Sequence, residues 1–273
     1  IGTQVICSFL YTLKKRLSWD MDYREFFEKR RIVTIPLLNP WGVVHRSRSN
    51  RNGVDLMRNA PIEAKDQATW LVGGHRISPR LPWYRGGLGA EMEVESQTLI
   101  NFVKKNIFSS PVSVCVDVHS GFGTKDQIWY PYAKSTDLFT YYEQFNRLKM
   151  LFEETYPHHV YIIEPQSKVY TTHGDLWDYL LLLHEQDCPN QVFIPLTLEL
   201  GSWNWVKKNP WQLFSMFGLF NPVKNHRYSR TMRRHLYLFD FLLRAVRNSE
   251  AWATLPSDFT TEIELKSKKI KVV

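Results

Sequence analysis

Hydrophobic residues recur along the chain at two spacings, which predict an alternation of helices and strands. Spacings of three and four residues predict helices over 1–17, 23–30, 91–105, 137–156, 174–185 and 228–247. Short runs of apolar and β-branched residues predict strands over 32–38, 112–119, 127–132 and 191–201. Strands that alternate with crossover helices are typical of an α/β sheet covered on both faces.

Three of the predicted strands end in polar residues. Asn39 follows the first, Asp117 and His119 end the second, and Glu199 ends the last. In α/β sheets functional groups gather beyond the carboxyl ends of the strands. We therefore expect the segments around His119 and Glu199, and the one around Arg48 in the loop after the first strand, to converge on one pocket at this edge of the sheet.

The loop after the first strand, Asn39 to Pro61, is rich in arginine. It carries Arg46, Arg48, Arg51 and Arg58. Several fixed guanidinium groups suit a carboxylate, a phosphate or a developing oxyanion. The alternative is a solvated basic loop without a binding role.

The two strand ends carry candidate chemistry of different kinds. Asp117 and His119 are two residues apart, so their side chains leave the same face of the strand. His119 is a candidate metal ligand, with a structural core histidine as the alternative. Glu199, in TLELG, ends an apolar strand and needs a cation, a donor or a catalytic role, because burying an unpaired carboxylate is unfavourable. A salt bridge to one of the arginines is the alternative for Glu199.

Size and composition favour one large domain spanning residues 1–273, with an extended tail at 256–273. The 273 residues are 44% hydrophobic, and no segment resembles a linker. Cys7, Cys115 and Cys188 form no CxxC pair, which favours a reducing, cytoplasmic location. No apolar run is long enough to span a bilayer, so we expect no membrane partner.

The net charge of +8 reflects basic residues in the arginine loop, at 226–234 and in the tail. A nucleic-acid surface would be basic too, but no nucleic-acid-binding motif is present, and a solvated helix face with a charged tail is favoured. The sequence also lacks GxSxG, HExxH, Walker and GxGxxG motifs. Cys115 falls inside a predicted buried strand, which disfavours a nucleophile.

The arginine loop resembles that of the zinc carboxypeptidase, or funnelin-type metallopeptidase, family. NPWG is followed by Arg48-x-Asn50-x-x-Gly53-Val54-Asp55-Leu56-x-Arg58-Asn59, where the family has NPDG and then RxNxxGVDLNRNF. The resemblance implies that Arg48 polarises the scissile carbonyl and that Arg58 and Asn59 bind the substrate. Met57 stands where the family has the asparagine of its carboxylate clamp, and a thioether cannot donate a hydrogen bond to a carboxylate.

The same resemblance assigns roles outside the loop. His119, in DVHSG, corresponds to the family's last zinc ligand, and Glu199 to its catalytic glutamate. Tyr170, ahead of a glycine turn and an Asp-aromatic pair, corresponds to the mobile tyrosine that closes over the substrate. An ordinary loop tyrosine is the alternative. The implied fold is a mixed, mostly parallel sheet flanked by helices.

A catalytic zinc needs about three protein ligands, and the family takes two of them from an HxxE motif. None of the nine histidines begins such a motif. The resemblance therefore implies that the ligand pair stands ahead of Ile1 and that the chain is N-terminally truncated. We expect this chain to bind zinc poorly and to be an inactive fragment.

The resulting hypothesis is a zinc-dependent hydrolase of peptide or amide bonds with a glutamate general base. Two alternatives stay open. The protein could be a degenerate peptidase relative that binds peptides, which Met57 favours, or an amidohydrolase acting on N-acyl amino acids. The expected partner is a peptide or acyl-amino-acid substrate, with no nucleic acid. The oligomeric state is left open.

Overall fold

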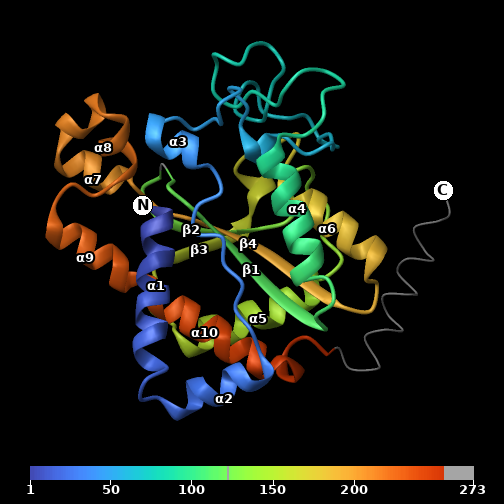
Figure 1. Ribbon diagram of the computed structural model, residues 1–273, viewed down its shortest axis with the longest axis vertical. Coiled ribbons are helices and arrows are strands. Elements are labelled where there is room, and N and C mark those ends of the chain that lie inside the picture. Colours follow the sequence, from blue (N-terminus) through green and yellow to red (C-terminus); the bar gives the residue numbers. More distant parts are fainter. Residues whose placement is uncertain (122, 255–273) are drawn as a thin grey trace.

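The computed structural model describes residues 1–121 and 123–254, and it is built around a four-stranded sheet (Figure 1). The strands are β1 (Val112–His119), β2 (Asp126–Tyr130), β3 (Tyr161–Pro165) and β4 (Val192–Glu199). Their spatial order is β1-β4-β2-β3, with β1–β4 and β2–β3 parallel and β2–β4 antiparallel. The predicted mixed, mostly parallel α/β architecture is confirmed.

The pairing of β1 with β4 fixes the geometry of the polar strand ends. The two strands are in register from Val112 opposite Val192 to His119 opposite Glu199. β4 is the most buried strand, and Phe193, Ile194 and Leu198 are fully enclosed in the core. Because both strands are parallel and end at the same level, the last residue of each is delivered to the same edge of the sheet.

Helices surround the sheet. In Figure 1, α4 and α6 lie together on the right of the strands, and α1 and α10 lie to the left and below. α1 and α10 contact β1, whereas α6 contacts β4. The helices are α1 (Gly2–Arg16), α2 (Met21–Lys29), α3 (Pro40–His45), α4 (Val94–Asn106), α5 (Tyr142–Thr155), α6 (Leu176–Asp187), α7 (Trp203–Lys208), α8 (Met216–Phe220), α9 (Asn225–Arg234) and α10 (Leu236–Arg247). Short 3₁₀ helices are η1 (Leu56–Arg58), η2 (Gln166–Lys168), η3 (Pro210–Phe214) and η4 (Ser249–Ala251).

The predicted strand over 32–38 is wrong. That segment is irregular and contributes no strand to the sheet. It lines the same cavity as β1, and no backbone hydrogen bond joins it to a strand of the described chain. Pro36 also lacks the N–H that a ladder requires. Alternating and β-branched residues predict a strand only where a partner edge is within hydrogen-bonding reach.

Two other expectations differ in detail from the structure. The predicted terminal helix over 228–247 is divided into α9 and α10 at His235, whose buried ring is hydrogen-bonded through Nδ1 to the Tyr161 hydroxyl at 2.9 Å. The helix predicted over 137–156 begins only at Tyr142. β3 was not predicted from the sequence. Its pattern is short, and one of its five residues is proline.

Within the described residues, no helix combines the length and the apolar character needed to cross a bilayer. The predicted tail at 256–273 lies outside the described residues. The expectation of one domain over 1–273 stays a prediction.

Candidate functional site

A cavity of about 2160 Å³ lies beside β1 and extends to the carboxyl ends of β1 and β4. Four of the residues singled out in the sequence line it, from four separate segments: Arg48, His119, Tyr170 and Glu199. The segments around Arg48, His119 and Glu199 therefore reach a common pocket, as expected from the sequence. Their chemical roles stay predictions.

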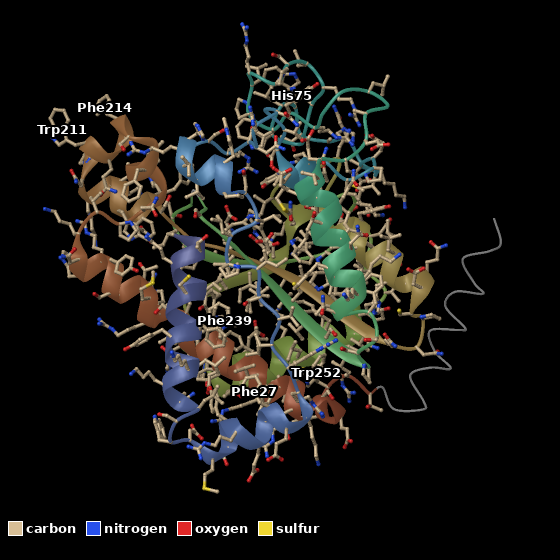
Figure 2. The ribbon with its side chains drawn as sticks, in the orientation of Figure 1. Phe27, His75, Trp211, Phe214, Phe239 and Trp252 are labelled. Atoms are coloured by element: carbon tan, nitrogen blue, oxygen red, sulfur yellow. The ribbon has the colours of Figure 1, made fainter. Side chains whose placement is uncertain are left out.

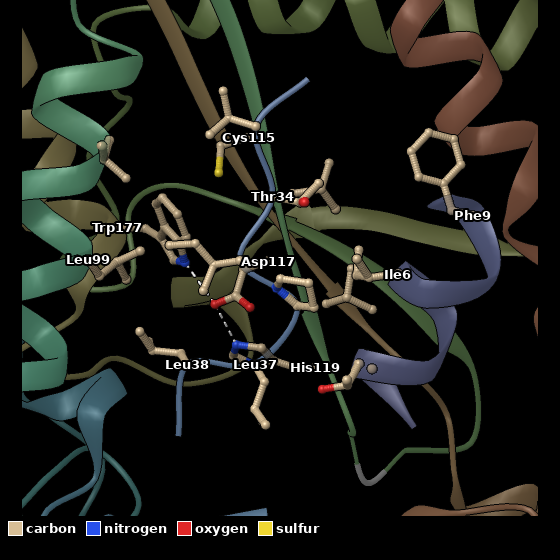
Figure 3. A pocket seen from close by; sticks show the side chains of 18 of the residues that line it. Ile6, Phe9, Thr34, Leu37, Leu38, Leu99, Cys115, Asp117, His119 and Trp177 are labelled. Carbon is tan, nitrogen blue, oxygen red and sulfur yellow. Dashed lines mark hydrogen bonds and ion pairs between the residues drawn. The ribbon is translucent and has the colours of Figure 1, made fainter. Parts of the chain in front are cut away.

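His119 is held between two carboxylates. Its Nε2 lies 2.8 Å from Oδ2 of Asp117, a hydrogen bond drawn in Figure 3. Its Nδ1 lies 3.2 Å from Oε2 of Glu199, at the distance of an ion pair but without the alignment of a hydrogen bond. The β1–β4 register creates the second contact, because His119 and Glu199 are directly opposite each other.

Asp117 serves two donors at once. Besides His119, its Oδ2 accepts a hydrogen bond of 2.8 Å from the indole Nε1 of Trp177 (Figure 3). Trp177 is buried in the first turn of α6. The side chain of Asp175 caps this helix by accepting from the N–H groups of Trp177 and Asp178. The capped helix thus fixes the indole, the indole fixes the carboxylate, and the carboxylate orients the imidazole.

These contacts shift the pKa values of His119 and Asp117. Burial alone would lower the pKa of His119, but Asp117 and Glu199 outweigh burial and raise it well above the usual value. Burial alone would raise the pKa of Asp117. The charge of His119 and the hydrogen bonds from His119 and Trp177 outweigh burial and lower this pKa. As the structure stands, a protonated imidazole between carboxylates is the favoured state.

Oε2 of Glu199 is buried beside the His119 imidazole, with which it forms an ion pair and not an aligned hydrogen bond. Oε2 has no hydrogen-bond partner among the described residues. The carboxylate is also packed tightly, since a Cβ added at Gly121 would lie 2.5 Å from Oε1. A buried carboxylate oxygen with an open lone pair is suited to accept a proton from a water molecule or to face a cation.

Arg48 is anchored at its inner end. Its Nε donates to Oδ2 of the buried Asp55 at 2.6 Å, and the Arg48 side chain is 44% exposed. Burial would raise the pKa of Asp55, but Arg48 and Arg58 together keep it lowered. The Asp55 contact uses one of the five guanidinium N–H donors, so the described contacts leave donors for a ligand.

Arg58 and Asn59 do not line this cavity. Arg58 is buried and donates to the carbonyl oxygens of Val72 and Met57, at 3.2 and 3.0 Å. The side chain of Asn59 donates to the carbonyl of Arg85 and accepts from the N–H of Glu93. Both residues are thus engaged with backbone, and a role in substrate binding stays a prediction for each.

Tyr170 contacts both the cavity and Arg58, which lies outside the cavity. It lines the cavity, its ring is 5.8 Å from that of Trp129 in an edge-to-face arrangement, and the Arg58 guanidinium lies 5.8 Å from its centroid. Met57, at the position where the resemblance expects asparagine, lines the cavity as well. Met57 therefore gives the cavity wall an apolar side chain where the resemblance expects an amide.

The described residues do not complete a zinc site. No group of three or more His, Cys, Asp or Glu side chains in that part of the chain is arranged to hold a metal ion. His119 could supply one ligand, and Oε2 of Glu199 lies beside the His119 ring. A catalytic zinc, however, takes about three protein ligands. The donors of the described residues therefore do not fit a bound zinc by themselves.

Sequence reasoning missed three contributors to the site. Asp55 is the anchor of Arg48, Trp177 is the second donor to Asp117, and Gly121 leaves room for the Glu199 carboxylate. Asp55 lies within the GVDL motif, so a signal was present. The other two depend on contacts between distant segments, which the sequence does not display.

The chain matches the family model for zinc carboxypeptidase over residues 1–201. Its fold is similar to that of bovine thrombin-activatable fibrinolysis inhibitor, solved in complex with tick carboxypeptidase inhibitor. The TM-score is 0.50 with 17% identity, covering 78% of this chain and 68% of that one. Carboxypeptidase A from Helicoverpa armigera gives a TM-score of 0.45 and 21% identity, over 62% of this chain and 42% of that one. No curated protein matches the chain. Because the family match spans most of its length, and the site residues lie within it, the chain belongs to the zinc carboxypeptidase family, and family and fold support a carboxypeptidase-type hydrolase.

Proposed function

We propose that the protein hydrolyses peptide or amide bonds, with Glu199 as general base and Arg48 stabilising the developing oxyanion. One observation carries the proposal. Arg48, His119 and Glu199, from distant parts of the chain, line one cavity, and a buried oxygen of Glu199 has no hydrogen-bond partner among the described residues.

Glu199 is suited to remove a proton from the attacking water. Its Oε2 is buried and forms no aligned hydrogen bond among the described residues, so it can accept a proton from a water molecule in the cavity. Gly121 and the β1–β4 register hold it in place. The proton accepted by Glu199 can then pass to the leaving amine, as general acid–base catalysis requires.

Arg48 is suited to bind the carbonyl oxygen as negative charge develops on it. The Asp55 carboxylate fixes the guanidinium before the substrate arrives, so little reorganisation is needed during the reaction. His119 is proposed as one zinc ligand, oriented by Asp117. Since the described residues do not complete the site, we expect the 273-residue chain to retain well under one zinc per chain after dialysis, as metal analysis would show. One tightly held zinc per chain would contradict this ligand assignment.

The functional test is hydrolysis by protein expressed from its complete reading frame with zinc supplied. Substituting Arg48→Gln removes the proposed oxyanion donor, and we expect kcat to fall by roughly a hundredfold or more. Arg51→Gln is the matched control, because Arg51 belongs to the same loop but is exposed and absent from the cavity lining. Equal activity of the two variants would overturn the role of Arg48.

A peptide-binding module without catalysis is the second candidate, favoured by Met57 in the cavity wall. It predicts peptide binding with no turnover in any form of the protein. A comparison of substrates distinguishes a carboxypeptidase from an amidohydrolase. A carboxypeptidase that uses Arg58 and Asn59 to bind a terminal carboxylate cleaves free-acid peptides and not their C-terminal amides, whereas an amidohydrolase prefers N-acyl amino acids.

A further inference from the structure

The segment from α7 to α8 presents aromatic side chains to solvent at the edge of the molecule. Trp211 is 80% exposed and Phe214 83% exposed, and their rings lie 5.9 Å apart. Figure 2 shows both side chains pointing away from the body of the protein at its upper left. Leu213 and Phe217, from the same segment, are also exposed. Large apolar side chains gathered in this way mark an interaction surface.

The aromatic side chains are held outward by a rigid support. Gln212, between Trp211 and Phe214, is buried, and its Nε2 donates to the carbonyls of Gly218 and Asn221 at 2.7 and 3.1 Å. Gly218 allows α8 to pack closely, because a Cβ there would lie 2.9 Å from the Gln212 carbonyl oxygen. These contacts fix the backbone from which the Trp211 and Phe214 side chains project.

The part of the chain that contains this aromatic tip carries one sign of charge. Between Glu199 and Asp240 the chain has no acidic residue. The basic residues in that interval are Lys207, Lys208, Lys224, Arg227, Arg230, Arg233 and Arg234. Arg234 is paired with Asp126, whereas Lys207, Lys208, Lys224, Arg230 and Arg233 are exposed. This interval includes the basic stretch 226–234, which the proposed catalytic function does not use.

We infer that the aromatic tip, Trp211 to Phe217, and its flanking lysines dock on an anionic lipid surface. Trp and Phe insert at the boundary between headgroups and acyl chains, and Lys and Arg near them are attracted to acidic headgroups. A projecting tip suits insertion into a lipid layer. A single-stranded nucleic acid is instead bound along a basic groove lined with stacking platforms. The sequence led us to expect no membrane partner because no segment could span a bilayer, but docking of this kind needs no spanning segment.

The test is cosedimentation of the protein with vesicles of phosphatidylcholine alone and with about one third phosphatidylserine. We expect binding to the anionic vesicles only, weakened by high salt. Trp211→Ala with Phe214→Ala should weaken it by roughly tenfold or more. Trp70→Ala is the matched control, since Trp70 is equally exposed but lies in a distant loop, and it should bind normally.

Charge reversal provides a second, independent test. Lys207→Glu with Lys208→Glu should also weaken binding by at least about tenfold, whereas Lys14→Glu with Lys15→Glu on α1 should have a much smaller effect. These exposed substitutions leave the folded core untouched, which circular dichroism would check. Equal binding to neutral and anionic vesicles, no binding, or equal loss in the control variants would overturn the inference. Preferential binding of a single-stranded oligonucleotide through the same residues would replace the lipid surface with a nucleic acid.

Discussion

The candidate site depends on how single residues are shared between partners. Asp117 accepts hydrogen bonds from both His119 and Trp177 through one oxygen. It contacts no proposed reacting atom, so it acts through His119 as a positioning residue. Such a carboxylate fixes which nitrogen of an imidazole carries a proton and how the ring is turned.

Substituting Asp117→Asn should disturb both donors, because an amide offers one acceptor and adds N–H donors where acceptors are needed. We expect a loss of about 1–3 kcal/mol in the free energy of unfolding, measured by urea denaturation. Asp137→Asn is the control, since Asp137 is half exposed and pairs with the exposed Lys65 and with Ser135, two residues before it. Similar effects of the two substitutions would mean that the Asp117 contacts contribute little.

A buried histidine far from the site should control acid stability. Burial lowers the pKa of His184 to about 4, and its Nδ1 meets the Tyr141 hydroxyl at 3.0 Å. The unfolded chain protonates this residue near pH 6.5, so it binds more protons than the folded protein between these values. Stability is therefore full above about pH 6.5 and falls as the pH drops towards 4, by roughly 2 kcal/mol at about pH 5 from this residue alone.

Urea unfolding at a series of pH values checks this expectation. His184→Gln should flatten the acid slope by that amount, whereas the exposed His158→Gln should leave it unchanged. An unchanged slope in the His184 variant would show that another group is responsible. His235, whose pKa burial also lowers to about 4, contributes equally to both variants.

At the scale of elements, the sequence predicts well wherever a segment carries its own signal. β1 and β4 are rich in apolar and β-branched residues, and their bounds differ little from the prediction. The segment over 32–38 has the same composition but no partner strand, so local pattern alone misleads. Arg48 lines the cavity at the strand ends, as the resemblance of its loop implies, although the strand predicted before that loop is absent from the sheet. The Trp177 and Gly121 contacts could not be foreseen, because they depend on the relative placement of α6, β1 and β4.

The turn before α6 offers a test of how closely elements must approach. Gly174 has φ of +66°, and a Cβ there would collide with the carbonyl oxygen of Arg58. Gly89 has a similar φ of +73° but open space around it. We expect Gly89→Ala to cost about 1 kcal/mol from backbone strain alone and Gly174→Ala at least about 3 kcal/mol. Thermal or urea unfolding measures both, and equal losses would contradict the close packing at Gly174.

At the scale of the molecule, the sheet edge and the aromatic tip are separate surfaces with separate chemistry. The edge brings Arg48, His119 and Glu199 to one cavity, and family and fold agree with a carboxypeptidase-type hydrolase. The tip from Trp211 to Phe217 lies beyond the residues matched by the family model, which end at 201. Its exposure was not visible in the sequence, because aromatic residues at that density predict a core as readily as a surface.

The proposed mechanism depends on Glu199 to remove the proton from the attacking water. Its most direct test is the kinetics of Glu199→Gln in protein expressed from the complete reading frame with zinc supplied. Gln keeps the size of the side chain but cannot accept the proton, so we expect kcat to fall by about 10²–10⁴-fold with KM changed only slightly. Unchanged kcat in a folded Glu199→Gln variant would show that Glu199 is not the general base.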